Sequence, residues 1–303
     1  MKNLKKLIRQ KMHILPRSIR RIGGGYYADV YKADCEDNKI LIVKVYKTAD
    51  VMENEILQLD ILSKYSLYPM PQILLSHKAD EEFDKDLIVM NYLTGRNAGN
   101  ILYLSSDKKL RLANQITDNL IAFHKIKSPD GFGELSSEMR YKTWNEYYKE
   151  KASAILTLAQ QLKNKGELSD YVFEVMQTAT ANFDKIFYLP ITEASLIHGD
   201  YNTWNILADK KECKVTAVID PCGCMWADSE YDLYQLSNAN GKHLGLFENY
   251  ASKIKLSENH KEKMAFYELF TEIEHYYKSG HPVVKKAVKK QADALNYYLE
   301  RLK

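Results

Sequence analysis

The sequence predicts an α+β protein with two lobes: a small antiparallel sheet within residues 1–92 and a mainly helical part within residues 93–303. Two observations support this prediction. Short β-rich runs separated by turn residues fill most of the first part, and residues 40–46 and 87–95 are the clearest examples. From about residue 96 onwards, apolar residues instead recur at the spacing of an α-helix. Strands grouped before helices are typical of α+β folds.

The chain begins with a basic stretch. Residues 1–21 hold eight Lys or Arg residues and no acidic residue. Leu4, Leu7, Ile8 and Met12 recur at helical spacing in this stretch, and no small-residue cleavage site follows it. We therefore expect an amphipathic helix with a solvated basic face, in preference to a targeting segment or a nucleic-acid-binding arm.

Three consecutive glycines, Gly23, Gly24 and Gly25, lie between two β-rich runs and predict a turn between strands. Glycine also lets backbone N–H groups approach phosphate oxygens closely. The turn is therefore a candidate phosphate-binding site. The pattern is neither G-x-G-x-x-G nor a Walker loop, so an ordinary hairpin turn is the alternative.

Lys44 lies in the middle of the predicted strand at residues 40–46. An unpaired Lys buried there would be costly, so it needs an anionic partner or an exposed position. In the V-A-I-K strand of kinases the partners are nucleotide phosphates and a Glu of the following helix. The helix predicted at residues 52–62 offers Glu55 as the first choice of partner and Glu53 as the second.

The last strand of the first lobe runs into a connector at Asn91, Tyr92 and Leu93. In a kinase-like arrangement, backbone groups of such a connector meet the edge of an adenine ring. A surface loop without ligand contacts is the alternative for these three residues.

Helices are expected over much of the second lobe, with Ser169 or Asp170 as a cap of one of them. Trp144, Tyr147 and Tyr148 could line a substrate cleft, but aromatic residues at this spacing more often belong to a core. The predicted helices cover residues 108–125, 142–163, 169–188, 233–240, 266–278 and 283–302.

The stretch from His198 to Asn205 carries the strongest chemical signal. It lies between apolar runs, and it offers a carboxylate at Asp200 and a carboxamide five positions later at Asn205. In phosphoryl transfer an Asp accepts the proton of the attacking hydroxyl, and an Asn of the same loop holds a magnesium ion. The catalytic loop of protein kinases has the same Asp-to-Asn spacing. The alternative is a capped turn with a buried His.

A second acid follows on a nearby strand, as a magnesium site requires. The β-rich run at residues 215–219 ends in Asp220, which is the expected metal ligand. Cys222 and Cys224 lack a second pair and so do not predict a zinc site; we interpret them as packing residues beside the active site. Asp228 and Asp232 are expected to cap a helix or to tie down the catalytic loop.

The bulk composition is that of an ordinary soluble globular protein, with 45% apolar and 27% charged residues. No run approaches the roughly 18 apolar residues that a membrane span requires. Four Cys are too few for a disulfide framework, which favours a reducing cytoplasm. Beyond residue 21 the chain has 35 basic and 40 acidic residues, a balance that suits a cationic small substrate better than nucleic acid. We expect no association with a membrane. The sequence makes no prediction of oligomeric state.

These motifs resemble the aminoglycoside phosphotransferase and fructosamine (ketosamine) kinase family, which has a protein-kinase-like fold. The most specific pieces are H-G-D-x-x-x-x-N at residues 198–205, I-D-P at 219–221 and A-D-S-E-Y-D-L at 227–233. The last of these is similar to the G-D-R-E-x-D-L of the fructosamine kinase branch. Further similarities to that branch are Phe123-His124, Gly131-Phe132-Gly133, Trp144, Tyr267-Glu268-Leu269-Phe270 and His275-Tyr276-Tyr277.

The resemblance implies ATP and Mg²⁺ as cofactors. It implies Asp200 as the catalytic base, Asn205 and Asp220 as magnesium ligands, and Lys44 with Glu55 as the anchor of the ATP phosphates. We therefore expect a cytoplasmic kinase that transfers the γ-phosphate of ATP to a hydroxyl of an amine-bearing sugar such as a ketosamine. An aminoglycoside antibiotic phosphotransferase is the alternative within this class. A non-catalytic nucleotide-binding module is the alternative from another class.

Overall fold

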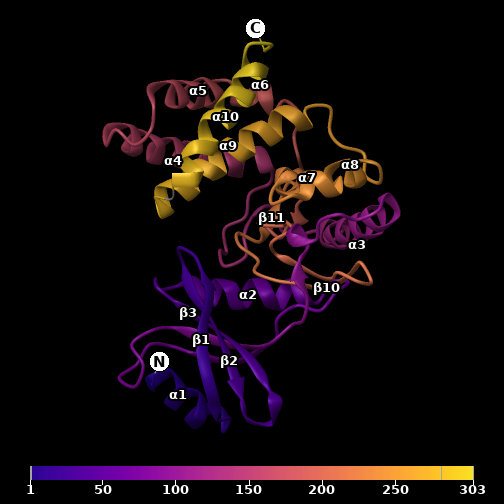
Figure 1. Ribbon diagram of the computed structural model, residues 1–303. Helices are drawn as coiled ribbons and strands as arrows, with labels where there is room; N and C mark the ends of the chain where they lie inside the picture. Colours follow the sequence, from indigo (N-terminus) through magenta and orange to yellow (C-terminus); the bar gives the residue numbers. More distant parts are fainter. Residues whose placement is uncertain (1, 281, 303) are drawn as a thin grey trace.

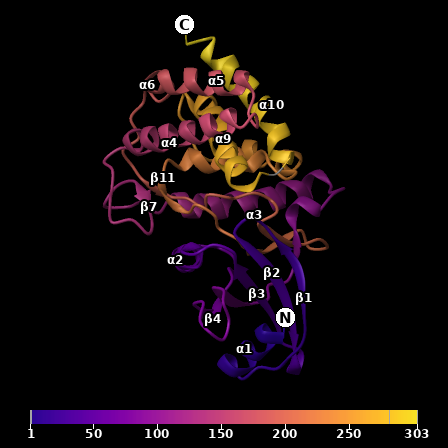
Figure 2. The ribbon, with the colours of Figure 1, turned by 90° about the vertical axis from the view of Figure 1, so that its left-hand side faces the viewer.

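The computed structural model describes residues 2–280 and 282–302, and it shows two lobes (Figure 1). One lobe contains an antiparallel sheet, and the other is mainly helical. Helices α1 (Lys2–Met12) and α10 (Pro282–Leu299) lie at opposite ends of the molecule in both views (Figure 1, Figure 2). The predicted two-lobed α+β fold is confirmed, whereas the division between residues 92 and 93 stays a prediction.

Five strands form the sheet of the smaller lobe, in the order β1-β2-β3-β5-β4. They are β1 (Pro16–Gly24), β2 (Ala28–Cys35), β3 (Ile40–Tyr46), β4 (Ile73–His77) and β5 (Leu87–Asn91). Side chains alternate between the two faces of a strand. Leu41, Val43 and Val45 of the central strand β3 therefore share one face, where they belong to the same apolar cluster as α1. Lys44 points to the opposite face, toward the helical lobe.

The helix α1 covers the outer face of this sheet. Leu4, Leu7 and Ile8 are buried in the cluster with the strands, whereas Lys6 and Arg9 are exposed. This is the amphipathic helix with a solvated basic face that the sequence predicts.

Helix α2 (Val51–Ser63) lies between the sheet and the helical lobe (Figure 1, Figure 2). Its residues Met52, Leu59 and Leu62 are buried in an apolar cluster that also includes α3 (Ser106–His124) of the helical lobe. Beyond α2, the backbone N–H of Leu67 donates to Oδ1 of the buried Asn119 at 2.6 Å. These contacts hold the sheet against the helical lobe.

The long helices of the second lobe are α3, α4 (Trp144–Asn164), α9 (His260–Ser279) and α10, close to the predicted ranges. A capping box of Thr143 and Glu146 sets the start of α4. Trp144 and Tyr148 are fully buried and stack on each other, with ring centroids 5.1 Å apart. Both side chains therefore belong to the core of the lobe, which is the interpretation that the sequence favours over a substrate cleft.

Two of the predicted helices are wrong in detail. Residues 169–188 form α5 (Asp170–Ala181), capped by Ser169, and a separate α6 (Phe183–Ile186). The break occurs at Asn182, whose side chain donates back to the carbonyl of Thr178 and so competes with the helix. Residues 233–240 do not form an α-helix; a 3₁₀-helix, η3 (Ser229–Ser237), comes first and α7 (Gly241–Leu244) follows. Because η3 is buried on nearly every side, apolar periodicity could not reveal its type.

Short elements complete the larger lobe: η2 (Ala98–Asn100), α8 (Leu246–Ala251) and two small sheets. One sheet has the order β10-β9-β6 and the other β7-β11-β8. Their strands are β6 (Arg96–Asn97), β7 (Gly133–Glu134), β8 (Ser195–Leu196), β9 (Ile206–Asp209), β10 (Lys214–Val218) and β11 (Met225–Ala227). Within the described residues, no helix combines the length and the apolarity needed to span a membrane.

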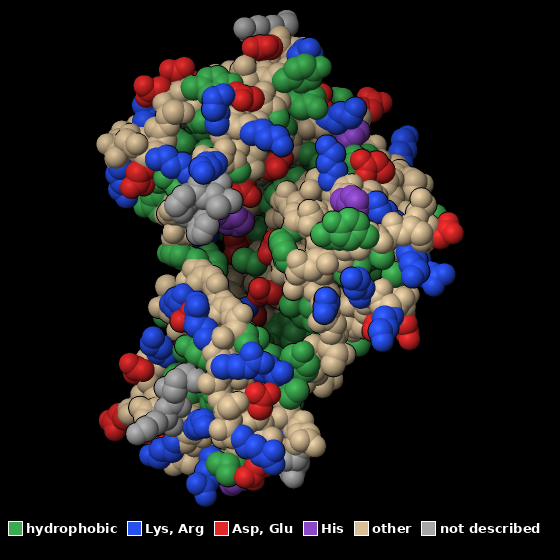
Figure 3. Space-filling view, viewed as in Figure 1, with side chains coloured by type: hydrophobic (Ala, Val, Ile, Leu, Met, Phe, Trp, Pro, Cys, Tyr) green, Lys and Arg blue, Asp and Glu red, His purple; other side chains and the backbone are tan. Residues whose placement is uncertain are grey.

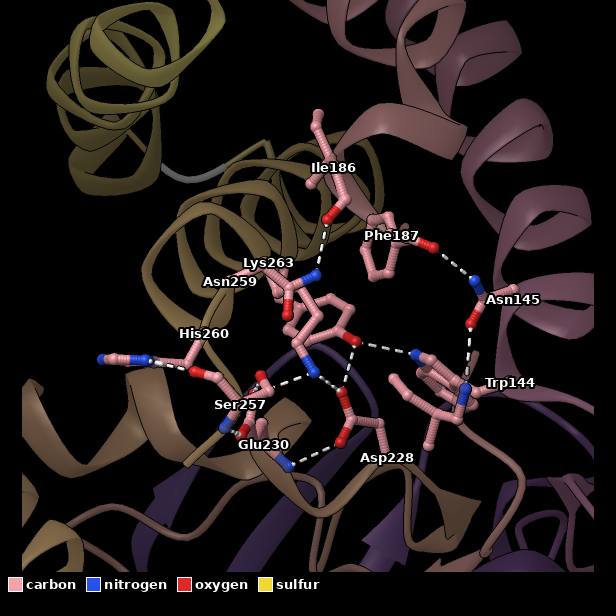
Figure 4. A network of polar contacts seen from close by, with 12 residues as sticks. Trp144, Asn145, Ile186, Phe187, Asp228, Glu230, Ser257, Asn259, His260 and Lys263 are labelled. Carbon is pink, nitrogen blue, oxygen red and sulfur yellow. Dashed lines mark hydrogen bonds and ion pairs between the residues drawn. The ribbon is translucent and has the colours of Figure 1, made fainter. Parts of the chain in front are cut away.

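A buried network of charges fixes the start of η3 (Figure 4). Lys263 of α9 places its Nζ 2.7 Å from Oδ2 of Asp228 and 2.8 Å from Oε2 of Glu230, and all three side chains are less than one-tenth exposed. The hydroxyl of Tyr267 also donates to Asp228 at 2.7 Å, and it accepts a hydrogen bond from Nε1 of Trp144 at 2.8 Å. The network therefore joins α4, α9 and η3.

Replacing the buried cation should destabilise the whole lobe. In Lys263→Met the carboxylates of Asp228 and Glu230 would stay buried without a counter-charge, so we expect a loss of about 3–5 kcal/mol in the free energy of unfolding. Urea denaturation measures this quantity. Lys289→Met is the matched control, because Lys289 pairs with Asp293 on the surface of α10 and should cost less than about 1 kcal/mol. Equal losses in the two variants would show that the network contributes no special stability.

Candidate active site

The loop from residue 198 to residue 205 is held from behind by a buried carboxylate. Asp232 of η3 is fully buried, and its two oxygens accept hydrogen bonds from the backbone N–H groups of His198 and Gly199, each at 2.8 Å. Nε2 of His124 lies 3.2 Å from the same carboxylate. Gly199 has a φ of +82°, and a Cβ there would overlap the backbone of Cys222. Asp232 thus ties down the loop, as the sequence predicts.

Asp200 is surrounded by amide donors of its own loop. Nδ2 of Asn205 donates to Oδ2 of Asp200 at 2.8 Å, and Nδ2 of Asn202 donates to Oδ1 at 2.6 Å. Burial raises the pKa of Asp200 to about 7, the two amide hydrogen bonds oppose the rise, and the nearby charge of Asp220 adds to it. The carboxyl group can therefore gain or lose a proton near neutral pH.

Asp220 reaches the same place from the end of β10. The strand ends at Val218, and Asp220 adopts a φ of +57°, which turns the chain sharply at this point. Nδ2 of Asn205 lies 3.5 Å from the carbonyl oxygen of Asp220. The side chain of Asp220 is 52% exposed, so its oxygens face the open space between the lobes. Asp200, Asn205 and Asp220 are thus brought together.

Lys44 connects this group to the sheet lobe. Its Nζ lies 2.8 Å from each carboxylate oxygen of Glu55 and 2.5 Å from Oδ1 of Asp220. Burial disfavours the charge of Lys44, but the carboxylates of Asp220 and Glu55 outweigh it and raise the pKa of Lys44 above its ordinary value. Glu53, the second choice of partner, instead pairs with Lys78 at the surface.

The hydroxyl of Tyr46 donates to Oε2 of Glu55 at 2.9 Å. Sequence analysis missed Tyr46, although it lies two residues after Lys44 and so shares its face of β3. The tyrosine orients the carboxylate that holds the lysine.

Two cavities meet at Lys44, Glu55 and Asp220, which line both of them. The surface is hollowed between the lobes, and acidic side chains are visible inside (Figure 3). The smaller cavity has a volume of about 280 Å³, and the larger one about 450 Å³. The smaller cavity is lined mainly by apolar residues and by the connector, namely Ile22, Val30, Ile42, Pro71, Met90, Asn91, Tyr92, Leu93, Leu207 and Ile219.

The predicted nucleotide-binding residues are distributed over these two cavities. Asn91, Tyr92 and Leu93 line the smaller cavity, and Gly25 lines the larger one. Among the residues that the structure describes, Gly23 and Gly24 line neither cavity, because they form the end of β1. The turn formed by residues 25–27 approaches the cleft in their place.

One face of α9 forms a wall of the larger cavity. Thr271, Glu274, His275 and Lys278 line it, and their spacing of three, four and seven positions places them on one side of the helix. Glu134 and Lys151 line the same cavity from β7 and α4. Sequence analysis missed this wall. The available signal was a stripe of polar residues along a helix whose other faces are apolar.

The two cysteines differ from each other. Cys224 is buried in an apolar cluster, as predicted. Cys222 is exposed and lines the larger cavity, so its prediction as a packing residue is wrong. The cause is the turn at Asp220, which brings residues 221–225 along the edge of the cleft.

The raised pKa of Asp200 should appear in the pH dependence of stability. A carboxyl group whose pKa is higher in the folded state than in the unfolded state binds its proton more tightly in the folded state. The contribution of Asp200 to the free energy of unfolding is therefore present at low pH and is lost as the pH rises from about 4 to about 7. Asn cannot ionise, and Asp200→Asn should escape this loss. From about pH 5 to about pH 8 we expect the variant to gain on the order of 2 kcal/mol relative to the unchanged protein. Urea denaturation of both proteins at both pH values measures the difference, and parallel pH profiles would contradict the assignment.

Comparisons with known proteins agree with this arrangement. A family model described as the phosphotransferase enzyme family, APH, matches residues 18–267. Among solved structures, a candidate fructosamine-3-kinase from Thermobifida fusca YX-ER1 is similar, with a TM-score of 0.71 and 17% identity over 98% of this chain and 99% of that chain. The aminoglycoside phosphotransferase APH(4)-Ia, a thermostable mutant in a ternary complex with ADP and hygromycin B, has a TM-score of 0.71 and 16% identity over 97% of each chain.

A curated relative, the uncharacterized protein YcbJ of Escherichia coli strain K12, is 23% identical over 173 residues, or 56% of each chain. The chain thus spans about half the length of the curated relatives it matches. The structural similarities establish the protein-kinase-like fold, and the predicted enzyme class is confirmed at the level of the family. Since the family match extends from β1 into α9 and covers most of the chain, the chain belongs to the phosphotransferase enzyme family.

Proposed function

We propose that the protein is an ATP- and Mg²⁺-dependent kinase that phosphorylates a hydroxyl of an amine-bearing sugar, as a fructosamine (ketosamine) kinase does. One observation carries the proposal: Lys44, Asp200, Asn205 and Asp220, from both lobes, converge at the junction of two cavities. Two substrates and one ion can meet there.

In this proposal the smaller cavity holds the nucleotide. Its apolar walls suit a flat base, and the backbone of Asn91, Tyr92 and Leu93 offers hydrogen-bonding groups at its rim. Lys44, oriented by Glu55, binds the phosphates where the two cavities meet. The turn at residues 25–27 covers the phosphate chain in this proposal. A cytoplasmic location, where ATP is available, is part of the same proposal.

The residues at this junction fit a magnesium ion. Asp220 offers a carboxylate and Asn205 a carboxamide, both of them hard oxygen ligands, and Mg²⁺ commonly takes only one or two protein carboxylates and completes its shell with substrate phosphates and water. When bound, the ion would neutralise charge on the phosphates. Asp220 and Asn205 would hold it there.

Asp200 accepts the proton of the attacking hydroxyl in this proposal. A general base works best when its pKa lies close to the working pH, and the pKa of Asp200 is raised to about 7. Asn202 and Asn205 fix the orientation of the carboxylate. Most of the catalysis then comes from positioning and charge neutralisation.

The acceptor occupies the larger cavity, beside Asp200. The fructosamine-3-kinase neighbour supports a ketosamine as the acceptor, and the neighbour that holds hygromycin B supports an aminoglycoside as the second candidate. A non-catalytic nucleotide-binding module would have no use for Asp200 and Asn202 beside the metal-binding side chains. An assay of ATP consumption with ketosamines, amino sugars and aminoglycosides separates these three candidate functions. If none of the compounds stimulates ATP consumption, the proposed kinase function is contradicted.

Asp200→Asn should reduce turnover by about 10²–10⁴-fold, because the base would be lost. Nucleotide affinity should stay nearly unchanged, since Asp200 binds no phosphate in this proposal. Single-turnover phosphate transfer measures the first quantity, and calorimetric titration with ATP and Mg²⁺ measures the second. Turnover close to that of the unchanged enzyme would rule out Asp200 as the base.

Asp220→Ala should instead weaken the binding of the metal ion. We expect the magnesium-dependent part of ATP affinity to fall by roughly tenfold or more, since a direct ligand would be lost, while metal-free nucleotide binding changes much less. Titrations with and without Mg²⁺ make the comparison. An equal effect in both conditions would mean that Asp220 does not hold the ion.

A further inference from the structure

The acceptor end of the larger cavity carries both signs of charge. Apart from the residues already assigned to the nucleotide, the ion and the base, the acidic, basic and histidine side chains of its lining are Glu134, Glu274, Lys151, Lys278 and His275. Burial lowers the pKa of His275, which therefore adds no charge near neutral pH. Two carboxylates and two ammonium groups remain, so the wall that would face the acceptor has no net charge.

The ammonium group of Lys151 lacks a close partner. Its side chain is 19% exposed, and Oε2 of Glu274, the carboxylate paired with it, lies 3.7 Å away. Glu274 is already shared, because Lys278 donates to its Oε1 at 2.5 Å. Among the residues described, the ammonium of Lys151 donates no hydrogen bond of ordinary length. An ammonium has three N–H donors, and leaving them unused in a largely buried place is costly.

A polycationic acceptor would fit this wall poorly. Its amines would approach the ammonium groups of Lys151 and Lys278, and like charges in a partly desolvated site repel one another. Glu134 is the one carboxylate of the wall that pairs with neither lysine, and its Oε1 accepts a hydrogen bond from the hydroxyl of Tyr147 at 3.2 Å. The wall therefore offers one place for a cation and a larger one for an anion.

We propose that the acceptor is a zwitterion, whose anionic oxygen group binds the ammonium groups of Lys151 and Lys278 and whose amine faces Glu134. The inference rests on the proposed function and narrows its substrate class. The acceptor is then a ketosamine of an amino acid, with a free carboxylate, in preference to a sugar amine without one. Lys151 and Lys278 determine specificity and take no part in the phosphoryl transfer.

A matched pair of acceptors tests the anion directly. Fructosylglycine and 1-deoxy-1-methylaminofructose share the sugar and the amine, and they differ only in the carboxylate. We expect kcat/KM to be roughly tenfold or more higher for fructosylglycine, mainly through a lower KM. The aminomethylphosphonate analogue separates the two possible sources of the anion. If the kcat/KM of this analogue exceeds that of fructosylglycine, the site binds a phosphoryl group. If fructosylglycine has the higher kcat/KM, the site binds a carboxylate. Equal kcat/KM for fructosylglycine and the methylamine would overturn the proposal.

Variants locate the effect. Lys151→Met should raise the KM for fructosylglycine and remove its advantage over the methylamine, with the KM for ATP unchanged, and Lys151→Arg should restore part of the advantage. Lys149→Met is the matched control on the same helix, because Lys149 is half-exposed and pairs with Asp184 at the surface. Thermal denaturation shows that each variant is folded. A rise in the KM for ATP in Lys151→Met, or an unchanged preference for fructosylglycine, would contradict the assignment.

Failure of the proposed function can be told apart from failure of this inference. If neither ketosamine is phosphorylated, the ketosamine kinase proposal fails, and calorimetry then compares the binding of the two compounds without turnover. Tighter binding of fructosylglycine that is lost in Lys151→Met still supports the anion site. Equal binding, or none, overturns it.

Discussion

The ammonium group of Lys44 contacts side chains from both parts of the site at the place where the two cavities meet. It contacts Glu55 on α2 and Asp220 on a loop. Asp220 lies 176 positions after Lys44 in the chain. Its burial is tolerable only because both carboxylates are in place, so the strand, the helix and the loop must be arranged together. The positions of the nucleotide pocket and of the acceptor pocket, relative to each other, depend on this arrangement.

The catalytic loop depends on a second layer of buried charge behind it. Asp232 holds the backbone of His198 and Gly199, while Asp228 and Glu230 fix the start of the same 3₁₀-helix through Lys263. Asp232 and the network around Lys263 are buried behind the loop, so water screens their charges little. The loop can therefore present Asp200 in one orientation before any substrate binds, which is the preorganisation that phosphoryl transfer requires.

The sequence predicts those parts of the site whose residue types are hard to explain otherwise. A Lys in an apolar strand requires a partner, and the spacing of Asp200 and Asn205 between apolar runs indicates a polar loop held by a core. The acceptor wall had no such signal. Lys151 and Lys278 lie on helices where a Lys usually belongs to a solvated face, and only the packing of α4 against α9 turns them toward a cavity. The type of η3 was hidden because buried residues on nearly every side erase the periodicity. The break at Asn182 was hidden because the apolar periodicity of residues 170–186 continues across it, while a side-chain hydrogen bond to Thr178 interrupts the helix.

The central claim is that both lobes bind one nucleotide–metal complex at Lys44, Asn205 and Asp220. A crystal structure with Mn²⁺ and a non-hydrolysable ATP analogue tests it most directly, because manganese is located by its anomalous signal. The claim predicts one manganese ion in direct contact with oxygens of Asn205 and Asp220, and the amine of Lys44 on the phosphates. A nucleotide bound elsewhere, or a manganese ion that touches neither side chain, would contradict it.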